Sequence, residues 1–276
     1  MSMMMDPEKL VSLPIWMAGL LLVGCALTAA VVIEAVVRRV IPLKIRMTHN
    51  TAAAAMFNVV GTTYAVLLAF VAMLAWEGFD KAQSITVTEA SLVLSVYQLV
   101  EGLSGPEMNS MREDIIAYGN AVVRVEWPAQ ASGEAVTEDE PALMHLTRTA
   151  LHLRPGNIAD GDLHTLLLND LMGLSSARRE RLLIERTSIP ILVWFVLLAG
   201  GNISIAFSSF LGARSFRMHL AMSSLLALSG ALVLLLIIAL SHPFHGDLSI
   251  SPEAFERVLA QMTSHDPSTG LPHRIP

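Results

Sequence analysis

Residues 58–79 read NVVGTTYAVLLAFVAMLAWEGF, and this stretch decides the fold class. It carries no charge before Glu77, and it is too long and too apolar for the half-buried helix of a soluble domain. A helix needs about 20 apolar residues to cross the hydrocarbon core of a bilayer. We therefore expect a transmembrane helix here. Its polar residues, such as Asn58, raise the question of whether the helix only anchors the chain or also lines a path through the membrane.

The composition extends this reading to the rest of the chain. Hydrophobic residues make up 53% and charged residues only 15%, whereas soluble domains average about 25% charged residues. Four runs without Asp, Glu, Lys or Arg are long enough to cross a bilayer; they span 10–33, 47–76, 187–213 and 218–246. We read the first as a retained helix because no basic segment precedes it. The sequence therefore predicts an all-α integral membrane protein with four transmembrane helices.

Between the second and third spans lies an insertion of residues 77–188 with helical periodicity of its own. One predicted seam follows Met108, Met111, Ile115, Tyr118, Val122 and Val125, and another follows Leu143, Leu146, Ala150 and Leu153. Breaks are expected at SGPE (104–107), with a Ser104 to Glu107 capping box, at EWPAQASGE (126–134), where Pro128 and the small polar residues after it end the helix, and at RPGN (154–157). These signals predict an insertion of four helices, continuous at both ends with membrane helices.

The chain is accordingly divided into five segments. We expect a first transmembrane helix with a basic loop (1–50), a second transmembrane helix (51–76), the acidic helical insertion (77–188), the third and fourth transmembrane helices (189–242), and a tail with a short helix (243–276). In the tail, Ser251 is expected to cap a helix beginning at Pro252, with Phe244 and Phe255 packed at the membrane surface or against the insertion.

The short loops predict the orientation of the chain. The first loop carries Arg38, Arg39, Lys44 and Arg46, and the third carries Arg214 and Arg217. Basic short loops lie on the cytoplasmic side, which places the insertion and both termini outside the cytoplasm, in a bacterial inner (plasma) membrane. One group of basic residues favours the opposite orientation. It lies just before the third span, is partly offset by Glu180 and Glu185, and consists of Arg178, Arg179, Arg181 and Arg186.

Motifs for enzyme chemistry are missing from the sequence. It has no dinucleotide or P-loop glycine pattern, no HExxH, and a single cysteine, Cys25. We predict neither an enzyme nor a cofactor. The nearest metal-ligand pattern is His242, His245 and Asp247, which we read as a turn at the end of the fourth span in preference to a metal site. The insertion has 17 acidic and 9 basic residues, so nucleic acid is not expected as a partner.

A stripe of small and weakly polar residues runs along the second span. Asn58, Thr62, Ala65 and Ala69 recur at helical spacing, and Glu77 and Asp80 follow after Trp76. Small stripes let membrane helices pack closely, so packing and pore lining are both open readings. In a pore, Glu77 and Asp80 would ring the mouth, where carboxylates favour cations. In the third span, Gly200 and Gly201 are expected to soften the helix beside Asn202.

Several stretches resemble the bestrophin-like family of bacterial and plant membrane proteins. They are GTTYAVLLAFVAMLAWEGFDKA (61–82), Glu89 with Ala90, REDIIAYGNAVVRVEWP (112–128) and PFHGDLSISPEAF (243–255). The family is named for a remote similarity to bestrophins, pentameric anion channels whose second helix lines the pore. Two features depart from bestrophins: Ala75 stands where they have an Arg before the Trp, and no dense acidic run follows the fourth span.

Two classes of function remain open at this point. The leading hypothesis is a homo-oligomeric ion channel, a pentamer by resemblance, with the second helix of each subunit around an axial pore that passes inorganic ions and favours cations. Its partners are then the lipid bilayer and further copies of itself. The alternative is a non-conducting membrane sensor or scaffold that binds a ligand or partner through the acidic insertion.

Overall fold

A computed structural model describes residues 14–134, 136, 140–154, 156–186, 189–212 and 215–264. The described residues are helical, without strands. The helices are α2 (Ile15–Val40), α3 (Leu43–Thr48), α4 (Asn50–Gly102), α5 (Met108–Ala121), the π-helical turn η2 (Val122–Glu126), α6 (Trp127–Ser132), α7 (Pro141–His152), α8 (Ile158–Arg186), α9 (Ile191–Phe210), α10 (Phe216–Leu240) and α11 (Glu253–Ser264). Arg214 and the tail beyond residue 264 lie outside the described residues.

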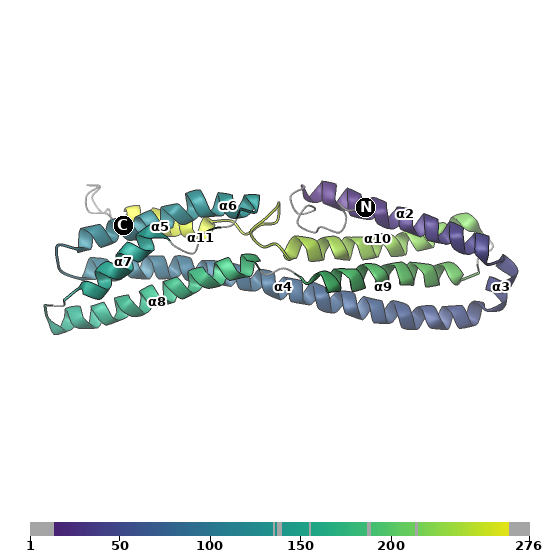
Figure 1. Cartoon of the computed structure of the whole chain (residues 1–276), viewed down its shortest axis with the longest axis horizontal. Helices are drawn as coiled ribbons and strands as arrows, with labels where there is room; N and C mark the ends of the chain where they lie inside the picture. Colours follow the sequence, from purple (N-terminus) through teal and green to yellow (C-terminus); the bar gives the residue numbers. More distant parts are fainter. Residues whose placement is uncertain are drawn as a thin grey trace, which may run out of the picture. The chain divides into compact units, whose positions relative to one another are not determined.

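The chain forms two units, and α4 contributes to both. The first unit holds α2, α3, α9, α10 and the part of α4 up to Phe79. Four helices are long and apolar enough to cross a membrane, namely α2, α4, α9 and α10, as the sequence predicts. The three shorter ones contact each other and run side by side with the first part of α4 (Figure 1).

Apolar side chains from three of these helices build the core of the first unit. Leu68, Val71 and Ala75 of α4 lie in one buried cluster with Leu197 of α9 and Ile237 of α10. A smaller cluster joins α2, α9 and α10. Most of each span nevertheless remains uncovered: only 17% of the apolar window of α4 is buried. The single chain therefore leaves much apolar helix surface for lipid or other protein to cover.

The second unit consists of the rest of α4, the helices from α5 to α8, and α11. Within it, α5 packs on α7, α7 on α8 and α11 on α5. Phe255 of α11 is fully buried and its ring lies 5.8 Å from that of Trp127, which confirms the predicted packing of this residue against the insertion. The C-terminal helix thus completes a core that begins more than 150 residues earlier in the chain.

The helix that begins with α5 ends within EWPAQASGE (126–134), as predicted, although Pro128 is not its last residue. It runs through the π turn η2 into α6 with helical backbone angles at Glu126 and Trp127, and Pro128 directly follows the wider π turn. The helix ends at Gly133, whose φ of 76° is left-handed. The extra residue of the π turn also rotates the buried face, so that Val125 of the predicted seam is 66% exposed and Glu126 is buried.

Two other predicted features are wrong. Glu107 immediately precedes α5 and no side chain caps this helix, so the Ser104 to Glu107 capping box does not form. The reason is Pro106, which keeps the residue before it out of the helical region; Gly105 has a φ of 152°. The insertion is not continuous with the third span either, because α8 ends at Arg186 and α9 begins at Ile191 behind Pro190, whose ψ is 140°.

Candidate functional site

The membrane part of α4 presents three distinct faces. One is the narrow buried face already described, formed by Leu68, Val71 and Ala75, with Tyr64 partly buried beside it. The stripe of Asn58, Thr62, Ala65 and Ala69 forms a second face, and all four residues are exposed in the single chain. At 3.6 residues per turn these four lie within an arc of roughly 60°. The stripe therefore does not pack tightly inside its own subunit.

The third face of α4 carries large apolar side chains. Val59, Phe70 and Leu74 are exposed by 67%, 63% and 65%. Helical geometry places them roughly 100° to 160° around the helix from Asn58, on the far side of the stripe from the buried face. Small, weakly polar side chains and bulky apolar ones are thus segregated on the exposed surface of α4.

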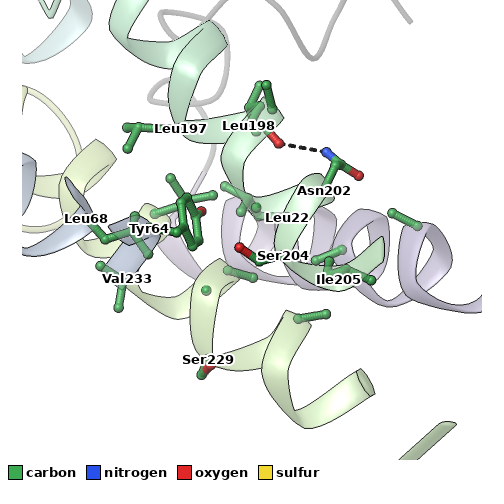
Figure 2. A pocket seen from close by; sticks show the side chains of 18 of the residues that line it. Leu22, Tyr64, Leu68, Leu197, Leu198, Asn202, Ser204, Ile205, Ser229 and Val233 are labelled. Atoms are coloured by element: carbon green, nitrogen blue, oxygen red, sulfur yellow. Dashed lines mark hydrogen bonds between the residues drawn. The ribbon is translucent and has the colours of Figure 1, made fainter. Parts of the chain in front are cut away.

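A cavity of about 760 Å³ lies among α2, α4, α9 and α10. Figure 2 shows its wall, with Tyr64 and Leu68 of α4 near Leu197 of α9 and Val233 of α10. Ala65 and Ala69 of the stripe also line it. These two residues therefore border a space within one subunit, whereas Asn58 and Thr62 do not.

Three polar side chains in the cavity wall, those of Asn202, Ser204 and Ser229, are bonded to their own helices. Asn202 donates to the carbonyl of Leu198 at 2.8 Å (Figure 2), Ser204 to that of Gly200 at 2.9 Å, and Ser229 to that of Leu226 at 2.8 Å. Such local bonds satisfy hydroxyl and amide donors in an apolar environment. The wall is consequently apolar in character, and Asn202 is paired as its position in a span requires.

Gly200 and Gly201 make room for Tyr64 and do not soften α9. The helix runs without interruption through both glycines. A Cβ on Gly200 would lie 2.7 Å from Cδ2 of Tyr64, and one on Gly201 would lie 2.9 Å from its hydroxyl oxygen. Both distances are shorter than real Cβ contacts allow. The ring of Tyr64 therefore packs directly against α9 at a place where only glycine leaves enough room.

The predicted pore-mouth carboxylates continue along α4. Glu77 and Asp80 are both exposed, and neither forms an ion pair or hydrogen bond with the described part of the chain. Lys81, the next residue, pairs with Glu180 at 2.6 Å. The two carboxylates are therefore available to ions or to another subunit.

His242, His245 and Asp247 are not brought together as a metal site. Within the described residues, no three His, Cys, Asp or Glu side chains are placed to hold a metal ion. Asp247 instead accepts a hydrogen bond of 2.9 Å from the backbone N–H of Ile15. A carboxylate at the first residue of α2 satisfies one of the N–H groups that every helix leaves unpaired at its start.

Comparison with known proteins identifies the family. Residues 24–255 match the family model of the bestrophin-like domain. The chain belongs to the bestrophin-like family. Its fold is similar to crystal structures of a bacterial bestrophin homologue from Klebsiella pneumoniae: one determined by zinc phasing has a TM-score of 0.63 and 15% identity over 90% of this chain and 99% of that one. A variant of the same homologue gives a TM-score of 0.65 and 14% identity over 88% and 99%. No curated protein matches.

The structure shows where Ala75 lies, one of the two positions at which this bestrophin-like chain departs from bestrophins. Ala75, where the resemblance leads one to expect Arg, is 7% exposed and belongs to the apolar core cluster. An arginine there would enter the core of the subunit. The exposed charges nearest in sequence are the acidic Glu77 and Asp80.

The second unit of the bestrophin-like chain contains a buried charge network. Arg181 of α8 donates to Glu89 of α4 at 2.7 and 3.1 Å and to Glu126 at 2.7 Å. Arg178 pairs with Glu126, and the hydroxyl of Tyr118 donates to Glu89 at 2.5 Å. Two carboxylates thus neutralise two guanidinium groups. Arg178 and Arg181 are therefore buried and paired, and they do not act as free positive charges that would oppose the orientation predicted from the basic short loops.

Electrostatics fixes the protonation state of this network. Burial alone would lower the pKa of the Arg181 guanidinium, but the charges of Glu89 and Glu126 outweigh burial and raise it. Burial, and then the charge of Glu89, raises the pKa of the Tyr118 hydroxyl well above its usual value. Arg181 therefore stays charged and Tyr118 stays a hydrogen-bond donor. Sequence reasoning missed this network because nothing local distinguishes Glu89 and Glu126 from solvated acids.

Proposed function

We propose that the chain is one subunit of a homo-oligomeric ion channel in which α4 of each copy lines an axial pore. The observation that carries this proposal is the segregation on α4: the stripe of Asn58, Thr62, Ala65 and Ala69 is exposed in the subunit, and between Asn58 and Ala69 no large apolar side chain shares its arc. Trp76 returns to this arc only at the end of the span. In an isolated chain such a face would lie against lipid, where Asn58 and Thr62 gain nothing. Around a symmetry axis it would face water and ions.

Family membership supports the same assignment. Bestrophins are channels, and the fold similarity covers nearly the whole of the Klebsiella homologue. By resemblance the ring is a pentamer, in the inner membrane of a bacterium. The helical insertion and both termini lie outside the cytoplasm, with Glu77 and Asp80 at the extracytoplasmic mouth. Their unpaired carboxylates support a preference for cations over anions.

The first test is ion flux through the purified protein in liposomes. We expect flux that increases with protein content and a particle that is an oligomer in detergent. A monomer that stays silent across voltage and pH would overturn the proposal and leave the alternative, a non-conducting sensor or scaffold that acts through the acidic insertion.

A matched pair of variants tests the pore-lining face. Thr62 lies on the stripe and Thr63 lies roughly 100° away, among the bulky residues; both are exposed. We expect Thr62→Trp to block flux and Thr63→Trp to leave it near the wild-type level, with both variants still oligomeric. Tryptophan at Ala65 or Ala69 is a less clean test because these two residues also border the cavity within the subunit. Equal flux through both threonine variants would show that the stripe is packing material.

A further inference from the structure

The loop end of the first unit contains a buried group of charges with an excess of cations. Glu34 of α2 is fully buried and has Arg38 at 2.6 Å, His219 at 3.2 Å and Arg46 at 3.6 Å. The sequence has no other acid between residues 35 and 76 or between 189 and 246. One carboxylate therefore faces two arginines and a histidine, and the site is short of negative charge.

Three members of this group have a buried polar atom without a hydrogen-bond partner within the described residues: Glu34 at Oε2, Arg38 at Nη2 and Arg46 at Nε. The Nη2 atom of Arg46 donates to the carbonyls of Ser209 and Leu211 and lies 3.5 Å from His219. A buried donor of a charged group that has no partner is costly, and a partner from outside the chain would satisfy it. Because two arginines face one carboxylate here, an anion also corrects the charge.

A cavity opens beside Arg46. It has a volume of about 260 Å³ and nine lining residues: Ile41, Ile45, Arg46, His49, Ala52, Ala53, Met56, Phe207 and Phe210. Seven of the nine are apolar, and Arg46 and His49 are the only basic ones. The wall of the cavity is therefore apolar almost throughout, and the charge of Arg46, which is only 3% exposed, lies just behind it.

Backbone packing holds this cavity in place. Gly212, just after α9, approaches α3 so closely that a Cβ would lie 2.9 Å from the backbone nitrogen of Met47. The N–H of Gly212 also donates to the side chain of Asn50 at 3.0 Å. The turn that carries Arg46 is thus fixed against the end of α9.

We propose that this cavity binds an anionic phospholipid, with its phosphate held by Arg46 and His49 and an acyl chain along the apolar wall. Basic pockets between membrane helices at the interface recognise anionic headgroups in this way. The exposed Arg39 and Lys44 of the same loop add to the attraction. This site is separate from the proposed pore and does not depend on conduction.

Binding of single lipids to the full-length protein in detergent, followed by native mass spectrometry, tests the proposal. The probes are phosphatidylglycerol and phosphatidylcholine of identical acyl chains. We expect the anionic lipid to bind tighter by at least about fivefold, the factor associated with one basic residue at a membrane surface. Equal binding of the two lipids would overturn the proposal.

Three variants locate the site. Arg46→Gln should remove the preference, and Arg39→Gln, which loses the same charge from an exposed position in the same loop, should retain most of it. Ala53→Phe should also reduce binding, because it fills the cavity while leaving the charged group intact; this keeps the test decisive if Arg46→Gln fails to fold. Equal loss in the Arg39 and Arg46 variants, or none with Ala53→Phe, would show diffuse attraction to the loop. Competition by millimolar inorganic phosphate would identify a free anion as the ligand and overturn the lipid assignment.

Discussion

Arg181 and Glu89 form a bidentate ion pair in which both side chains are fully buried, with N–O distances of 2.7 and 3.1 Å. The pair joins α8 to α4 across 92 residues of sequence. Charged groups this deep are tolerated only when each is paired and hydrogen bonded. The pair therefore ties α8 to α4 inside the core of the second unit.

Removing one partner of this pair should destabilise the second unit strongly. Arg181→Met leaves Glu89 and Glu126 without Arg181 in the core, and we expect a loss of about 3–5 kcal/mol. Arg179→Met is the matched control. Arg179 is exposed on a different side of α8, so this substitution should lower the free energy of unfolding by about 0.5 kcal/mol or less. The free energy of unfolding in denaturant, measured on the detergent-solubilised protein, checks both. Similar losses in the two variants would contradict the ion-pair assignment.

Alkaline pH should weaken the fold through Tyr118. Its pKa is raised in the folded state, so the stability it contributes is fully present below pH 10, the ordinary tyrosine pKa, and is lost as the pH rises from there through the folded pKa. In Tyr118→Phe the fall in the free energy of unfolding above pH 10 should be shallower. Tyrosinate absorbance provides the direct measurement: the wild type should have one more tyrosine that titrates only with unfolding than Tyr118→Phe has. A variant that titrates identically to the wild type would refute this.

Adding a methyl group beneath Tyr64 should destabilise the first unit. Gly200→Ala places a Cβ 2.7 Å from the ring, and overpacking of this kind costs about 1–3 kcal/mol. Gly230→Ala is the control on α10: it borders the same cavity but meets no atom within 4 Å, so helix propensity should make it neutral or slightly stabilising. Thermal unfolding in detergent distinguishes them. Equal midpoints would mean that Tyr64 does not rest on the glycine pair.

Neutralising the proposed mouth should reduce cation preference. Glu77→Gln with Asp80→Asn removes two exposed carboxylates per subunit, and the reversal potential in a salt gradient should shift towards weaker cation selectivity. Glu113→Gln on α5 removes an exposed charge away from α4 and serves as the control. An unchanged reversal potential in the double variant would place the selectivity elsewhere.

The orientation of the insertion can be read with a reporter. A fusion partner that is active only in the periplasm, joined after Gly133 at the exposed end of α6, should be active. The same reporter fused at Lys44, in the basic first loop, should be inactive. Activity in the reverse pattern would invert the topology and move Glu77 and Asp80 to the cytoplasmic side.

The sequence alone shows which segments of the chain suit lipid and which suit water. Long charge-free runs identify α2, α4, α9 and α10, because a helix in lipid cannot carry unpaired charges. The helical periodicity of apolar residues also predicted the buried face of α7, which is formed by Leu143, Leu146 and Ala150. The Pro-Gly pair in RPGN predicted the break before α8. These are local features, and the chain near each residue is enough to fix them.

Tertiary structure decided everything that depends on which distant residues meet. From the sequence alone, Glu126 is indistinguishable from a solvated acid, but the π turn rotates it inward against Arg178 and Arg181. Gly200 is expected to make its helix flexible, but in the structure it gives room to the ring of Tyr64. Asp247 resembles a metal ligand but accepts the N–H of Ile15 at the other end of the sequence. Burial and pairing of such groups are set by long-range packing. The sequence determined which segments are helices and which of them suit a membrane, whereas the contacts between helices determined what each polar side chain does there.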